Sequence, residues 1–105
     1  MDAETIQNRK EIVKGWLSRT LLNAGSNGIP VAQIAEAMGV SEASVYKYAS
    51  TSEENLIHLH NLLPLIQETQ DFFILEELAR TFGFALISIS DPLVMLKTLV
   101  KALEE

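Results

Sequence analysis

Cysteine is absent from this sequence of 105 residues, and its absence excludes a disulfide scaffold, a cysteine-built zinc ribbon and thiol catalysis. Basic residues are also few, eight against fourteen acidic ones, so the net charge of −6 lacks the basic excess that favours nucleic-acid binding. No apolar run approaches the ~20 residues of a membrane span, and the N-terminus has no signal-peptide pattern. We therefore expect a small cytoplasmic domain with no membrane partner.

The acidic excess is confined to one half of the chain. Residues 1–50 contain five basic and five acidic residues, whereas residues 51–105 contain three basic and nine acidic ones. Net charge describes solubility better than it describes one face of a protein. The first half can therefore contact a polyanion, although without the strong attraction that a basic domain exerts.

Apolar residues recur at three- and four-residue spacings along most of the chain, which is typical of amphipathic helices. The pattern predicts helices over about 4–24, 30–38, 42–50, 61–69 and 71–82, and a last helix that opens at Ser90-Asp91-Pro92. Gly25 and Gly39 are expected to end two of them in a left-handed conformation, and Gly83 to end a third. Residues 84–89 are rich in strand formers and predict a short strand.

Residues 31–50, VAQIAEAMGVSEASVYKYAS, have the pattern of a helix-turn-helix. Ala35 is small where the second helix crosses the first, and Gly39 accepts the positive φ that the turn needs. The apolar residues that flank the turn are Ile34, Met38, Val40, Val45 and Tyr48. This motif is known for placing its second helix in the major groove of DNA, although the same pattern also suits a helical hairpin within a core.

The helical wheel separates two faces of the second helix. Ser41, Val45 and Tyr48 are predicted to face the core, whereas Tyr46 and Lys47 point outward. An exposed tyrosine beside a lysine suits phosphate and base-edge contacts. The predicted DNA-binding residues are Ser41, Glu42, Ala43, Ser44, Tyr46, Lys47 and Ser50.

Two stretches resemble known families. IAEAMGVSEASVYKYASTSEENL resembles the DNA-binding end of TetR-type repressors, and LIHLHNLLPLIQETQDFFILEELARTFGFALI resembles the distal helices of phage regulatory proteins of the CII type. The order of five helices, with the motif at the second and third, is similar to the lambda-repressor-like fold, and the Gly-ended fifth helix before a strand also resembles some antitoxins.

These resemblances imply an all-α domain over residues 1–83, with the motif at 31–50, followed by a strand and helix extension over 84–105. They further imply a sequence-specific transcriptional regulator of phage or prophage type, acting in a choice such as that between lysis and lysogeny. Its mechanism would be promoter occlusion or recruitment of RNA polymerase.

The last predicted helix carries an apolar stripe that something must cover. Its proposed oligomerisation residues are Leu93, Leu96, Leu99, Val100 and Leu103. Packing on its own domain and assembly into a dimer or tetramer both remain open. The four phenylalanines between Phe72 and Phe84 favour a packed core or a subunit contact over a ligand pocket.

No other group of residues in the sequence indicates a metal site or a catalytic site. His58 and His60 are interpreted as surface or loop histidines, because H-x-H on a helix splits across faces. Glu53-Glu54 and Glu76-Glu77 are adjacent pairs rather than carboxylates facing one cleft. No phosphate-binding glycine loop, dinucleotide signature or catalytic triad order is recognisable. We therefore expect no enzyme, metal or cofactor.

The sequence thus predicts a regulator that binds duplex DNA as a homo-oligomer. The alternative is a protein–protein module or antirepressor whose helix-turn-helix no longer binds DNA, which the neutral first half and the acidic second half favour slightly. The charge around the motif discriminates between them. A DNA-binding protein should gather Arg9, Lys10, Lys14, Arg19 or Lys47 there.

Overall fold

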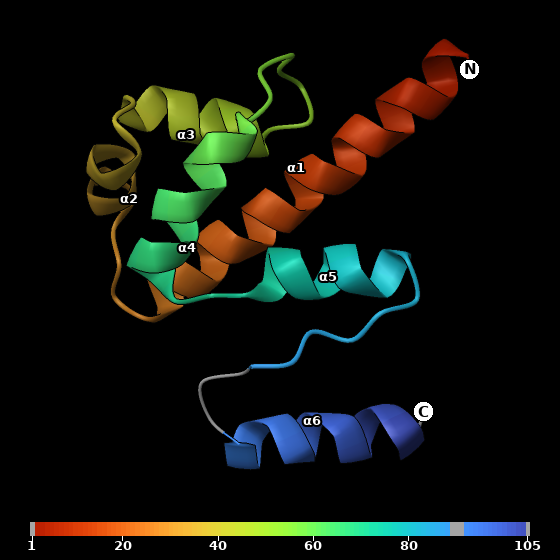
Figure 1. Ribbon diagram of the computed structural model, residues 1–105. Helices are drawn as coiled ribbons and strands as arrows, with labels where there is room; N and C mark the ends of the chain where they lie inside the picture. Colours follow the sequence, from red (N-terminus) through yellow and green to blue (C-terminus); the bar gives the residue numbers. More distant parts are fainter. Residues whose placement is uncertain (1, 89–91, 105) are drawn as a thin grey trace. The chain divides into compact units, whose positions relative to one another are not determined.

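The computed structural model describes residues 2–88 and 92–104, and all regular elements in these ranges are helices (Figure 1). The helices in chain order are α1 (Ala3–Ser26), α2 (Val31–Met38), α3 (Glu42–Ala49), the 3₁₀ helix η1 (Leu59–Asn61), α4 (Leu62–Thr69), α5 (Phe73–Thr81) and α6 (Pro92–Glu104). The predicted all-α class is confirmed. No described helix is both long and apolar enough to cross a bilayer.

The chain forms two compact units, Met1–Phe72 (unit 1) and Phe73–Glu105 (unit 2). In unit 1, α2 packs against α3 and α4, and α3 packs against α1 (Figure 1). One face of each helix is buried, as the periodicity predicts. The buried apolar residues of unit 1 are Leu17, Ala24, Ile34, Ala35, Met38, Val45 and Leu65. Assignment of residues 1–83 and 84–105 to separate functions stays a prediction.

Glycine ends α2 as the sequence predicts, and this ending creates the turn into α3. Gly39 has φ of 71°, its N–H donates to the Glu36 carbonyl, and the Val40 N–H donates to the Ala35 carbonyl at 3.1 Å. This pair of hydrogen bonds is the Schellman arrangement, in which the residue after the glycine folds back on the helix. The turn therefore satisfies two carbonyls of α2.

The predicted end of α1, near residue 24, is two residues too early, because the helix continues to Ser26. Gly25 lies inside the helix, and Gly28 instead takes the left-handed conformation, with φ of 78°. The reason lies in the following residue, because a left-handed ending is completed by an apolar side chain that packs back on the helix. Ile29 supplies this side chain after Gly28 and is half-buried, whereas polar Ser26 follows Gly25.

The short strand over residues 84–89 is wrong for 84–88, and Ile89 lies outside the described residues, as do Ser90 and Asp91 of the predicted helix opening. Strand-forming side chains favour a strand only where a second strand accepts the ladder hydrogen bonds. No strand exists elsewhere in the described ranges to pair with this segment.

Unit 2 buries little of its apolar surface. Ile74 is its buried apolar residue, and α6 has no buried residue in the described range. Phe82 and Phe84 are 70% and 71% exposed, and Phe72, at the end of unit 1, is also exposed. Interpretation of these three phenylalanines as core residues is therefore wrong within the chain.

The left-handed turn at Gly39 yields a stability prediction. Because β-branched residues resist positive φ, Gly39→Val should lower the free energy of unfolding by roughly 1–3 kcal/mol. Gly15→Ala is the control, since Gly15 lies inside α1 with open space around its Cα. It should raise the stability by about 0.5–1 kcal/mol. Urea unfolding measures both, and a Gly39→Val protein as stable as the wild type would contradict the described turn.

Candidate nucleic-acid interface

The second helix of the motif, α3, presents one face to unit 1 and the opposite face to solvent. Val45 is 3% exposed, whereas its neighbour Tyr46 is 56% exposed. Tyr48 is half-buried on the inner side, as predicted. Unit 1 therefore leaves the outer face of α3 open, which is the geometry that groove entry requires and a hairpin within a core would lack.

The predicted contact residues lie together on this helix and its two ends. Ser41, Glu42, Ala43, Tyr46 and Lys47 are exposed. Ser44 and Ser50 are half-buried. Ser41 was expected to face the core, and this is wrong. Its hydroxyl oxygen instead caps α3 by accepting the Ser44 N–H at 3.1 Å.

Charge on α3 is balanced rather than basic. Glu42 lies in its first turn and Lys47 in its last turn. Lys10, on α1, lies 3.9 Å from the carboxylate of Glu54, so this cation is directed toward the acidic loop after α3. Of the basic residues expected near the motif, Lys47 is the one on α3 itself.

Lys14 does not belong to the surface at all. Its side chain is 2% exposed, and its ammonium donates to the main-chain carbonyls of Lys47 at 2.9 Å and Tyr48 at 3.3 Å, and to that of Asn55. Burial lowers the pKa of Lys14 from its usual 10.5, while Glu53 and Glu54 act in the opposite direction. Three carbonyl acceptors match the three donors that only the ammonium form offers.

A signal for this burial exists in the sequence. Lys14 lies three residues before Leu17, which lies three before Thr20, and all of these are buried together with Ala24. A lysine on the apolar stripe of a helix is a candidate for burial. Its role was missed because its carbonyl partners, 33 to 41 residues later, are main-chain atoms that leave no trace in side-chain patterns.

An apolar depression of about 430 Å³ borders the outer face of α3. Its lining comes from α1, α2 and α3 and comprises Ser18, Leu21, Leu22, Val31, Tyr46, Ala49 and Ser50. Tyr46, the exposed residue of α3, is one of the residues that line it. The depression is open and shallow, so it resembles a contact surface more than an enclosed small-molecule site.

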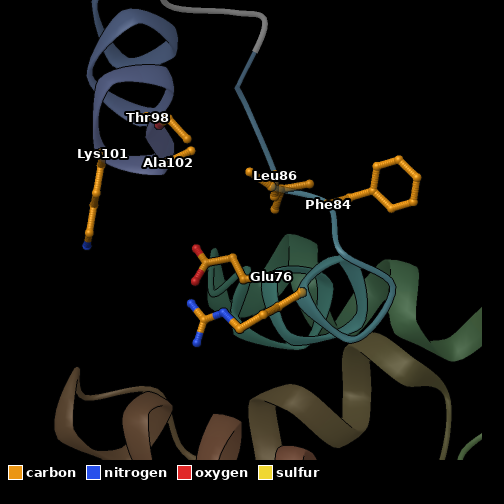
Figure 2. Close-up of a pocket in the computed structure, with 8 residues that line it drawn as sticks. Glu76, Phe84, Leu86, Thr98, Lys101 and Ala102 are labelled. Carbon is orange, nitrogen blue, oxygen red and sulfur yellow. The ribbon is translucent and has the colours of Figure 1, made fainter. Parts of the chain in front are cut away.

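Unit 2 has a hollow of its own, which has mixed chemistry. It measures about 300 Å³, and Glu76, Arg80 and Lys101 contribute its charged groups. Figure 2 shows Leu86 at this hollow, and the ring of Phe84 pointing away from α6. The arrangement does not bring a nucleophile, base and orienting group together as catalysis would require.

The two histidines stack on each other outside any metal cluster. The ring centroids of His58 and His60 are 5.6 Å apart, and both residues are exposed. Within the described ranges, no group of three metal-ligating side chains converges.

The fold is that of a small all-α protein in which a tight turn at Gly39 joins the eight-residue helices α2 and α3. The family model for phage regulatory protein CII (CP76) matches residues 21–105, and the chain belongs to this family. The resemblance to CII-type regulators is thus confirmed, and the protein is a phage-type regulatory protein. Searches of curated proteins and of solved structures find no match.

The cap at the start of α3 yields a second stability prediction. Because Ser41 satisfies a main-chain donor that the helix leaves unpaired, Ser41→Ala should lower the free energy of unfolding by about 1 kcal/mol. Ser41→Asn is the matched control, since asparagine caps helices as well as serine does. Urea titrations followed by circular dichroism measure both, and equal midpoints for the alanine and asparagine proteins would contradict the capping role.

Proposed function

We propose that this protein is a transcriptional regulator that reads duplex DNA with the outer face of α3, as a homo-oligomer held by residues 84–105. The observation that carries the proposal is the exposed α3 of unit 1, which follows the tight turn at Gly39. Membership in a family of phage regulatory proteins supports it. The regulated process would be transcription from a phage or prophage promoter.

The outer face of α3 has the chemistry that groove entry needs. Tyr46 and Lys47 extend from it, and the small side chains of Ala43 and Ser44 allow the first turn to approach base edges. Lys47 supplies a phosphate contact, and the tyrosine hydroxyl supplies a second polar contact. The Ser41 end of α3 is the end that lies nearest the bases in this class of motif.

Oligomerisation supports the proposal because one copy of α3 offers few phosphate contacts. Affinity from a single Lys47 contact would be weak, whereas two linked copies on half-sites about one helical turn (~10 base pairs) apart gain affinity without new contacts per subunit. α6 offers the means, since its apolar residues are exposed, Leu103 to 86%. The proposed assembly residues are Leu93, Leu96, Leu99, Val100 and Leu103.

The balanced charge of α3 favours one rival, a protein–protein module or antirepressor. Glu42 offsets Lys47 on the same helix, and a protein ligand would tolerate this charge balance better than a phosphate backbone. Selection from a randomised duplex library separates the two functions. Enrichment of one sequence supports the regulator, and absence of enrichment with the folded full chain supports the rival.

Charge reversal at α3 tests the DNA contact directly. Because Lys47 is exposed, Lys47→Glu should abolish binding to the selected duplex while leaving the fold intact. Gel-shift titration measures the binding, and circular dichroism measures the fold. Lys97→Glu on α6 is the matched control, since it changes the net charge equally and should keep the affinity. Unchanged binding by the Lys47 variant would overturn α3 as the DNA-reading helix.

Charges placed on the stripe of α6 test the assembly. Leu96→Glu with Leu99→Glu should yield monomers that bind the selected duplex far more weakly, because each buried carboxylate would need to be desolvated. Light scattering at tens of micromolar gives the mass. Lys97→Glu again serves as control, with the same change in net charge on the same helix. A monomeric wild type, or a double variant that keeps its mass, would refute assembly through α6.

A further inference from the structure

The buried ammonium of Lys14 connects three segments that are distant in the sequence. It belongs to α1, and its acceptors lie in the last turn of α3 and in the loop between α3 and η1. In Figure 1 this loop rises beyond the end of α3 and returns toward α4. One side chain therefore ties both the end of α3 and the loop to α1.

The acceptors on α3 are the groups that most need a cation. The last carbonyls of a helix have no partner within the helix, and they carry the negative end of its dipole. Those of Lys47 and Tyr48 both accept from Lys14. The Ser50 N–H also returns to the Lys47 carbonyl, at 3.3 Å. Lys14 thus acts as a cap for α3 that comes from another helix.

α3 packs on α1 and α2 through one face. Val45 is its one buried residue, and it lies in the middle of the helix. Tyr48, near the C-terminal end, is only half-buried, so apolar packing restrains a tilt of that end less firmly than it restrains the centre of the helix. Lys14 holds the C-terminal end of α3, close to Tyr46 and Lys47, so it limits this tilt.

We propose that Lys14 is a positioning residue for DNA recognition, which sets the angle of α3 on α1 by binding the carbonyls of Lys47, Tyr48 and Asn55. This inference rests on the proposed function. At 2% exposure the side chain itself does not reach DNA, so its effect passes through α3. Base contacts need α3 at one angle, whereas non-specific phosphate contacts tolerate several. Loss of Lys14 therefore reduces selectivity more than it reduces general affinity.

The experiment compares Lys14→Met with the wild-type full chain. Methionine keeps an unbranched side chain but has no donor for the carbonyls. Two duplexes are used, the one enriched from the randomised library and a scrambled version of it. We expect the ratio of the two affinities to fall about tenfold, equivalent to ~1.4 kcal/mol. Amide hydrogen exchange should accelerate in residues 46–57 and stay unchanged in α2 and α4.

Lys10→Met is the matched control, because it removes the same charge one turn earlier on α1. Lys10 makes an exposed ion pair with Glu54, and such pairs contribute little. For the Lys10→Met protein, the ratio of the affinities for the two duplexes should stay within about twofold of the wild-type ratio. Should Lys14→Met not fold by circular dichroism, Lys14→Gln takes its place. Its amide retains two donors, so the same changes are expected in smaller amount.

Two results overturn the inference alone. One is a selectivity ratio in the folded Lys14 variant equal to that of the wild type. The other is a proportional loss of both affinities with faster exchange throughout unit 1, which marks a purely structural residue. A wild-type chain that prefers no duplex overturns the proposed function itself, and the inference with it. That result is recorded before any variant is compared, so the two failures are distinguishable.

Discussion

Three of the helices in unit 1, α2, α3 and α4, contain only eight residues each, and this shortness is the constraint on which the rest depends. Helices of this length are unstable alone in water, because the cost of the first turn is offset by few hydrogen bonds. They persist because each buries an apolar face against its neighbours. The 24-residue α1 contributes the longest buried face among the packed helices of unit 1. Each of these short helices therefore forms only in the place where it packs against its neighbours.

A lysine in this packed region has an energetic cost that its hydrogen bonds must offset. Removing an ammonium from water is unfavourable, and the lowered pKa of Lys14 reflects that cost. Its three carbonyl partners return part of the cost, since Lys14 donates to the Tyr48 and Asn55 carbonyls and to the Lys47 carbonyl, which also accepts from the Ser50 N–H. An apolar residue would avoid the desolvation but would remove the Lys14 donor from these carbonyls, and a buried carbonyl that loses its donor is costly. Such a site exchanges some stability for a defined geometry.

Charge and exposed apolar surface are distributed differently in the two units. The first half of the chain is neutral, α3 is balanced, and the acidic excess lies beyond residue 50. Unit 2 leaves aromatic and leucine side chains exposed. In a monomer these side chains would stay in contact with water, which is unfavourable in free energy. In the proposed function these two features fit together, because assembly through the apolar surface would let several weak DNA contacts act at once.

Local signals in the sequence determined the helical class, the bounds of α2 and α3 and the left-handed turn at Gly39. Periodicity, glycine conformation and helix caps act over a few residues, so their effects can be predicted from the sequence without a structure. The outward direction of Tyr46 and Lys47 followed from the same periodicity. The resemblance of residues 29–89 to CII-type regulators was likewise recognisable from the amino-acid sequence.

Only the tertiary structure decided the features that depend on distant partners. The segment 84–88 has strand-forming side chains but no neighbouring strand, so it is not a strand. α1 continues through Gly25 to Ser26, and the left-handed residue is Gly28, after which the N–H of the half-buried Ile29 donates to the Ala24 carbonyl at 2.8 Å. Lys14 became a buried link instead of a surface cation because main-chain carbonyls from α3 and its loop meet it there. A main-chain acceptor is present at every residue, and folding alone selects which ones surround a given side chain.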